Sequence, residues 1–124
     1  MSTLNVSNIT DGTDTVGTSY VLNGSAKAWV NFNGQGTIAT RDSLNIASLT
    51  DQGTGLYDVN YTSNMSSSNY SLSLSTRGNR PADGDAGLSQ NIASKHKLQT
   101  RSGNQDSSFE DSDRLYSQVF GDLA

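Results

Sequence analysis

The sequence contains no cysteine, a single proline and a single histidine, and it has no long hydrophobic run. The absence of cysteine excludes disulfide bonds, iron–sulfur clusters and thiolate zinc sites. No segment approaches the roughly 20 apolar residues that a membrane-spanning helix needs, so we expect no membrane insertion. The polar N-terminal residues lack the apolar core of a secretion signal, and we expect no signal peptide.

Large apolar side chains are also scarce. Leu, Ile, Val and Phe make up 24 of the 124 residues, whereas Ser, Thr, Asn and Gly make up 56. The formal net charge of −4 is small for this length, so a folded β-rich chain is favoured over a disordered one. A chain this short and polar buries little apolar surface alone. We therefore expect one sandwich domain that is stabilised in part by neighbouring copies.

Few residues are suited to catalysis. His96, the only histidine, is flanked by Lys95 and Lys97, and we expect it to lie on an exposed strand. No Gly-x-Ser-x-Gly nucleophile motif occurs, and the acidic pI of about 4.6 argues against binding to nucleic acid. We expect no enzyme activity, no cofactor and no metal. The carboxylates are interpreted as solvated turn or loop charges at Asp11, Asp14, Asp83, Asp85, Glu110, Asp111 and Asp113.

Residues 25–124 have the pattern of an antiparallel β-sandwich, jelly-roll-like or immunoglobulin-like. Ala28, Val30 and Phe32 alternate with Trp29 and Asn31, which places the two sets on opposite faces of a strand. Asn33-Gly34 then predicts a type I′ hairpin turn. Further strands are predicted over residues 36–40, 44–48, 56–61, 70–75, 91–101 and 115–120, with a long loop over residues 77–89.

Residues 1–24 form a separate, polar N-terminal region. Leu4, Val6 and Ile9 indicate a short strand that is followed at once by turn residues. A lone short strand is not stable in water. The region is therefore either a frayed end or an arm that docks onto another protein through these three residues. We interpret residues 1–24 as an attachment arm in an assembly.

The tryptophan and the tyrosines allow two interpretations. Exposed aromatic rings on a β-sheet can stack on sugars, which makes Trp29, Tyr57 and Tyr61 candidates for binding glycans. Alternatively, the same rings fill the sandwich or a subunit contact, because aromatic side chains supply much of the burial in a core poor in aliphatic residues. The sequence favours the second interpretation.

One segment has a recognisable arrangement of motifs. Within residues 27–65 are Lys-Ala-Trp-Val-Asn, an Asn-Gly pair, Arg-Asp-Ser, Thr-Asp-Gln-Gly-Thr-Gly and Tyr-Asp-Val-Asn, and the chain ends near Val-Phe-Gly-Asp at residues 119–122. This arrangement resembles a module of bacteriophage virion proteins, especially of marine phages. Residues 1–9 are similar to the start of many such proteins. The resemblance does not extend over residues 77–113.

The resemblance implies a non-enzymatic virion structural protein with a β-sandwich fold, located in the virion and homotrimeric. The chain is short, which fits an exterior capsid-decorating, fibre or knob protein that contacts other capsid or tail proteins through its arm. The alternative is a receptor-binding module of a tail fibre that recognises glycans on the host surface.

Overall fold

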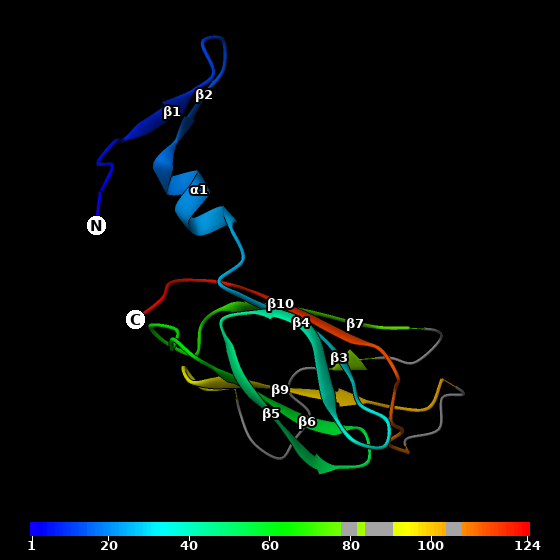
Figure 1. The fold of residues 1–124 in the computed structure, drawn as a ribbon. Coiled ribbons are helices and arrows are strands. Elements are labelled where there is room, and N and C mark those ends of the chain that lie inside the picture. The colour runs from blue at the N-terminus through cyan, green and yellow to red at the C-terminus, as the bar shows by residue number, and fades with distance from the viewer. Residues whose placement is uncertain (78–81, 84–90, 104–107) are drawn as a thin grey trace.

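The computed structural model describes residues 1–77, 82–83, 91–103 and 108–124. Figure 1 shows two β-layers and an N-terminal arm that stands off from them. In chain order the elements are β1 (Asn8–Thr10), β2 (Thr15–Gly17), α1 (Thr18–Gly24), β3 (Ala28–Asn33), β4 (Ala39–Leu44), β5 (Ile46–Gly53), β6 (Leu56–Tyr61), β7 (Ser71–Thr76), β8 (Ala82–Asp83), β9 (Lys95–Thr100) and β10 (Leu115–Phe120).

The two layers are four-stranded antiparallel sheets. Sheet I has the strand order β4-β3-β10-β7, and sheet II has the order β5-β6-β9-β8. All their strand pairs are antiparallel. The predicted all-β fold with packed antiparallel sheets is therefore confirmed.

The core lies between the sheets and comes from strands that alternate as the sequence predicts. On β3, Ala28, Val30 and Phe32 are buried, and Trp29 and Asn31 point to the other face. Phe32 meets Tyr57 of β6 edge to face, with ring centroids 5.3 Å apart, and this contact joins the two sheets. Two clusters make up the core. The first is Val30, Phe32, Tyr57, Val59, Leu98 and Leu115, and the second is Ala28, Tyr61, Met65 and Val119.

The β3–β4 connection differs from the predicted turn. The loop runs over residues 34–38, and its positive-φ glycine is Gly36, at 62°, so the expected type I′ turn at Asn33-Gly34 is wrong. Gly34 is needed for space, because a Cβ there would lie 2.5 Å from the Tyr57 hydroxyl and 2.6 Å from Leu115 Cδ1. The glycine of the Asn33-Gly34 pair is thus required by a tertiary contact and not by a turn conformation.

The chain crosses from sheet I to sheet II at Asn45. This residue has a φ of 58° and separates β4 from β5, so it interrupts the strand that the sequence pattern predicted over residues 44–48. Its side-chain amide donates to the carbonyl oxygens of Lys27 and Ser63, and its Oδ1 accepts from the Ser63 amide at 2.7 Å. Asparagine tolerates this left-handed conformation better than most residues, so one side chain holds the crossing in place.

The predicted loop over residues 77–89 lies mostly outside the described residues. Within it, β8 pairs with β9 through Ala82 and Thr100. The N-terminal region also contains more structure than expected. It holds a β1–β2 hairpin and the helix α1, and the helix ends at Gly24, four residues before β3 begins.

Candidate functional site

The N-terminal arm consists of residues 1–24. Its β1–β2 hairpin closes around Asp11, whose Oδ1 accepts the amides of Thr13 and Asp14. These bonds lower the pKa of the Asp11 carboxyl below its usual value. The carboxylate is therefore occupied by a turn, in agreement with its interpretation as a solvated turn charge.

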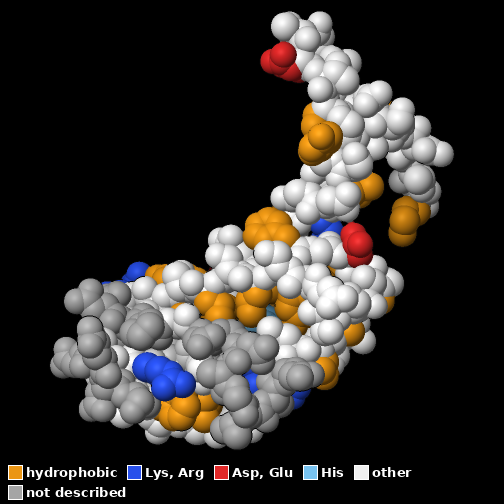
Figure 2. Space-filling model, turned by 180° about the vertical axis from the view of Figure 1, so that it is seen from behind, with side chains coloured by type: hydrophobic (Ala, Val, Ile, Leu, Met, Phe, Trp, Pro, Cys, Tyr) orange, Lys and Arg blue, Asp and Glu red, His pale blue; other side chains and the backbone are white. Residues whose placement is uncertain are grey.

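The predicted attachment residues are exposed. Leu4 has 82% of its surface exposed, and Val6 and Ile9 are also exposed. They are joined by further apolar side chains along the arm, which Figure 2 shows projecting from the body of the molecule. Among the described residues, eight of the twelve exposed large hydrophobic side chains belong to the arm. They are Met1, Leu4, Val6, Ile9, Val16, Tyr20, Val21 and Leu22.

The arm elements are too short to be stable by themselves. The hairpin strands have three residues each, and α1 has seven residues, none of them buried. Isolated two-stranded hairpins are marginal in water, and isolated helices shorter than about 12 residues are unstable. The arm thus combines unprotected apolar surface with weak intrinsic stability.

The three residues considered for glycan binding do not lie together. Trp29 points away from the core on the outer face of sheet I, where it is partly exposed. Tyr57 and Tyr61 are 1% and 5% exposed and lie between the sheets. The interpretation of these two tyrosines as glycan-binding residues is therefore corrected, because buried rings offer no surface on which a sugar can stack. Both fill the core, as the other interpretation of the aromatic residues predicted.

Tyr57 and Tyr61 use their hydroxyls inside the protein. The Tyr57 hydroxyl lies 2.9 Å from both the Gly34 carbonyl oxygen and Asp111 Oδ1, and the Tyr61 hydroxyl lies 2.8 Å from His96 Nδ1. Burial raises the pKa of both phenols above the usual value. They remain neutral and act as packing groups with satisfied polar ends.

His96 is the clearest departure from the sequence analysis. The sequence predicts that His96 lies on an exposed strand, and this is wrong: His96 is fully buried and faces the core together with Leu98 and Thr100 of the same strand. His96 Nε2 lies 3.0 Å from Ser117 Oγ of sheet I, while its Nδ1 meets Tyr61 of sheet II. Burial lowers the pKa of His96 to about 4. The neutral imidazole therefore connects the sheets through two hydrogen bonds.

The Tyr61–His96–Ser117 arrangement contains a serine beside a histidine, as a catalytic triad does, but a tyrosine takes the place of the carboxylate and the position does not suit catalysis. All three side chains are buried, with His96 at 0% and Ser117 at 1% exposure. A nucleophile must reach substrate, and a base must lie within hydrogen-bond reach of it. We assign this cluster to fold stability.

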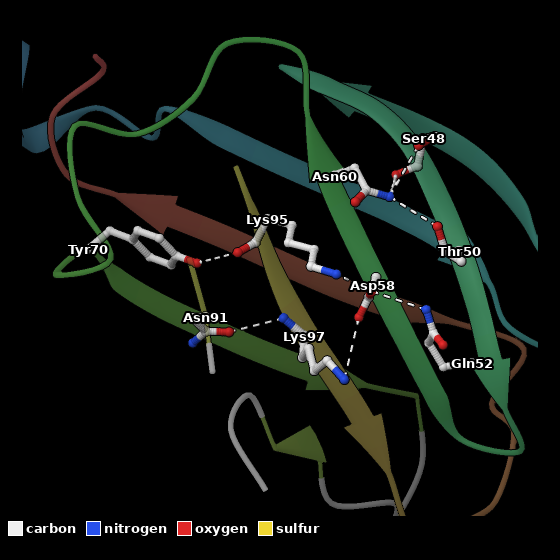
Figure 3. A network of polar contacts seen from close by, with 9 residues as sticks. All are labelled: Ser48, Thr50, Gln52, Asp58, Asn60, Tyr70, Asn91, Lys95 and Lys97. Carbon is white, nitrogen blue, oxygen red and sulfur yellow. Dashed lines mark hydrogen bonds and ion pairs between the residues drawn. The ribbon is translucent and has the colours of Figure 1, made fainter. Parts of the chain in front are cut away.

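The outer face of sheet II carries a polar network, drawn in Figure 3. At its centre is Asp58 of β6, a carboxylate that is only 3% exposed. Its Oδ2 accepts from Lys95 Nζ at 2.6 Å and from Gln52 Nε2 at 3.2 Å. Its Oδ1 has no hydrogen-bond donor, and Lys97 Nζ lies 3.8 Å away. Two ammonium groups thus surround one carboxylate.

The network continues to the edge of the sheet. Asn60 Nδ2 donates to Ser48 Oγ and Thr50 Oγ1 of β5. At the other side, the Lys97 amide donates to Asn91 Oδ1, and the Tyr70 hydroxyl donates to the Lys95 carbonyl oxygen. These side chains bond mainly to one another and to the backbone, so the network holds β5, β6 and β9 in register.

Replacing Asp58 by asparagine is expected to lower the free energy of unfolding by about 2 kcal/mol. The change leaves Lys95 and Lys97 without a counter-charge, and the loss is below the usual range for a buried pair because both lysines are about a quarter exposed. Urea unfolding measures the change. Lys97→Gln is the control and should cost about 0.5 kcal/mol or less. Equal losses in the two variants would show that Asp58 is not the centre of the network.

The acidic cluster near the last strand also has structural partners. Asp111 Oδ1 accepts the Gly55 amide at 2.6 Å, and Asp113 pairs with Arg77 at 3.0 Å. Over the described ranges, no group of three or more His, Cys, Asp or Glu side chains is arranged to hold a metal ion. Residues 84–85, part of the other predicted acidic turn, lie outside those ranges.

Sequence reasoning missed one set of surface residues. Tyr116, Gln118 and Phe120 alternate with the buried residues of β10 and therefore share the outer face of sheet I with Trp29. The alternation of Leu115, Ser117 and Val119 could have separated the two faces of β10. The pairing of β10 with β3 joins strands about 85 residues apart in the sequence, and no local pattern reveals it.

In the part of the chain that the structure describes, no helix has the length and apolar character to cross a bilayer. Comparisons with models of protein families, with curated proteins and with solved structures gave no match.

Proposed function

We propose that the protein is a non-enzymatic structural protein of a bacteriophage virion, held on the exterior of the particle by its N-terminal arm. It would be a capsid-decorating, fibre or knob protein whose partners are other virion proteins. The proposal includes a homotrimer, because neighbouring copies would add the apolar burial that this polar chain lacks. The motif arrangement over residues 27–65, which resembles a module of bacteriophage virion proteins, supports the proposal.

The exposed apolar arm is the observation that carries the proposal. Its side chains, from Leu4 to Leu22, are held away from the sandwich by short elements that need a partner to become stable. Strand addition by an arm is a common way in which one protein attaches to another. The sandwich, with its own closed core, would project from the attachment point.

The test replaces the three predicted attachment residues. Leu4→Ser, Val6→Ser and Ile9→Ser in one chain should lower the number of copies on purified virions more than tenfold, because each side chain loses about 1.5 kcal/mol or more of burial. Quantitative mass spectrometry of the particles gives the occupancy, and native mass spectrometry of the isolated protein gives its oligomeric state.

The matched control changes polar positions of the same segment. A chain with Ser2→Ala, Asn5→Ala and Ser7→Ala keeps all the apolar side chains and should attach as the unaltered protein does. Thermal unfolding followed by circular dichroism must show an intact sandwich in both variants. Unchanged occupancy of the Leu4, Val6 and Ile9 variant would contradict attachment through the arm.

A further inference from the structure

The outer face of sheet I carries three aromatic rings around one amide. Trp29 of β3 is directly opposite Gln118 of β10, and Asn31 is opposite Tyr116. Tyr116 and Phe120 are two residues before and after Gln118, so they lie on the same face as Gln118. Neighbours of this kind are close enough for aromatic side chains to act together. Trp29, Tyr116 and Phe120 are all partly exposed, and we call these residues with Asn31 and Gln118 the aromatic face.

The polar groups of the aromatic face are unused. Within the described residues, the Trp29 indole N–H, the Tyr116 hydroxyl and the side-chain amide of Gln118 have no hydrogen-bond partner. Asn31 Oδ1 is buried and also has none. By contrast, the hydroxyls of the tyrosines in the core and at its edge all have partners. The indole N–H, the Tyr116 hydroxyl, the Gln118 amide and the unbonded Nδ2 of Asn31 are at least partly exposed, so they are available to a ligand that supplies both donors and acceptors.

The aromatic face is also nearly neutral. The strands β3, β10 and β7 contain no charged residue. Serines 71, 73 and 75 alternate with inward-packed leucines on β7, which adds a row of hydroxyls beside β10. Of the four strands of sheet I, only β4 contains charged residues, which are Asp42, opposite Asn31, and Arg41, whose guanidinium donates to the carbonyl oxygens of Phe32 and Asp113. The ligand that matches this surface is therefore uncharged.

We propose that the aromatic face is a binding site for a neutral carbohydrate, with a sugar ring stacked on Trp29 and Tyr116 and its hydroxyls bonded to Asn31 and Gln118. A sugar presents C–H groups on its faces and hydroxyls around its edge, which complements aromatic planes set among amides. A protein partner is less well matched. Among the described residues of this face only Leu44, opposite Trp29, is a large apolar side chain with substantial exposure, at 47%.

This site goes beyond attachment to the virion and does not depend on it. The arm and the aromatic face share no residue, so the loss of one activity leaves the other measurable. Of the three residues that the sequence suggests for glycan binding, Trp29 belongs to the proposed site. Residues of β10 take the place of Tyr57 and Tyr61 in it.

The experiment uses Trp29, the only tryptophan of the chain, as its own reporter. The full-length protein is titrated with maltohexaose, cellohexaose, chitohexaose and mannohexaose, and with sialyllactose as a charged probe. At least one neutral probe should shift the Trp29 fluorescence to shorter wavelength in a saturable manner. Sialyllactose should give a weaker response.

Asn31→Ala and Gln118→Ala should each weaken the binding by about three- to tenfold, the loss expected for one hydrogen bond. Neither side chain amide is bonded within the described protein, so both variants are expected to fold. Tyr116→Phe tests the hydroxyl alone. Tyr20→Ala, which removes an exposed aromatic ring of the arm, is the matched control and should bind as the unaltered protein does.

Three results would overturn the proposal. The first is the absence of a saturable fluorescence change with every neutral probe. The second is a change that is equal in Asn31→Ala, Gln118→Ala and the unaltered protein, which would show non-specific quenching. The third is a shift of Trp29 fluorescence with protein concentration alone, which would show that a second copy of the chain covers this face.

Discussion

Replacing Gly55 by alanine is expected to lower the free energy of unfolding by about 4 kcal/mol. Gly55 lies between β5 and β6 with a φ of 66°, a conformation that costs a residue with a side chain roughly 1–2 kcal/mol. A Cβ at this position would also lie 2.5 Å from the Thr100 carbonyl oxygen and 2.9 Å from the Glu110 amide nitrogen. Overpacking of this kind costs about 1–3 kcal/mol more.

The neighbours of Gly55 cannot easily move away. Its amide donates to Asp111 Oδ1 at 2.6 Å, and its carbonyl oxygen accepts from the Thr100 amide at 2.8 Å. These bonds join the β5–β6 turn to β9 and to the segment before β10. Because the clash is with backbone atoms, relief of it would require a shift of the strand itself.

Urea unfolding followed by Trp29 fluorescence measures the loss. Gly36→Ala is the matched control, because Gly36 has nearly the same φ, 62°, but no atom within 4 Å of an added Cβ. The control should lose only the roughly 1–2 kcal/mol of backbone strain. Equal losses in the two variants would mean that the close approach at Gly55 contributes nothing.

The protein is expected to lose about 3 kcal/mol of stability as the pH falls from 6.5 to 4. Burial lowers the pKa of His96 from 6.5 to about 4, and the nearby negative charge of Asp58 only partly opposes this. Between these values the unfolded chain binds a proton at His96 and the folded protein does not. The free energy of unfolding should therefore fall by about 1.4 kcal/mol for each pH unit.

The single histidine makes this effect measurable. Stability is compared by urea unfolding between pH 7 and pH 5, a window above the ordinary pKa of carboxylates. His96→Gln should remove the dependence in this window, because glutamine does not titrate. Nuclear magnetic resonance of the imidazole gives its pKa in the folded protein. A free energy of unfolding that is constant from pH 7 to pH 5 would contradict the burial of a neutral His96.

The pattern of β3 shows how much could be predicted locally. Its alternating residues fixed which side chains face the core, and the same rule puts Tyr57, Val59 and Tyr61 on one side of β6, where all three are buried. The scarcity of aliphatic residues also indicated that aromatic rings would fill the core, which Phe32 and Tyr57 do. Period-2 alternation is a property of a single strand and needs no partner.

His96 and Gly34 show where local reasoning failed. An alternating strand has two faces, and the sequence of β9 does not say which one is covered, because a buried histidine and a solvated histidine look alike until a partner such as Ser117 is placed beside it. Gly34 resembles a turn residue, but a glycine is required at this position because a Cβ would clash with the Tyr57 hydroxyl of the opposite sheet.

The sequence by itself determined the class of the fold, the alternation of its strands, the separate N-terminal region and the lack of thiol chemistry. These properties depend on composition and on neighbours within a few residues. Only the tertiary structure decided that His96 is a buried link between the sheets, that Tyr57 and Tyr61 are core residues, and that Trp29 shares a face with Tyr116 and Gln118. Each of these depends on strands far apart in the chain, which meet only when the strands pair within a sheet or when the two sheets pack.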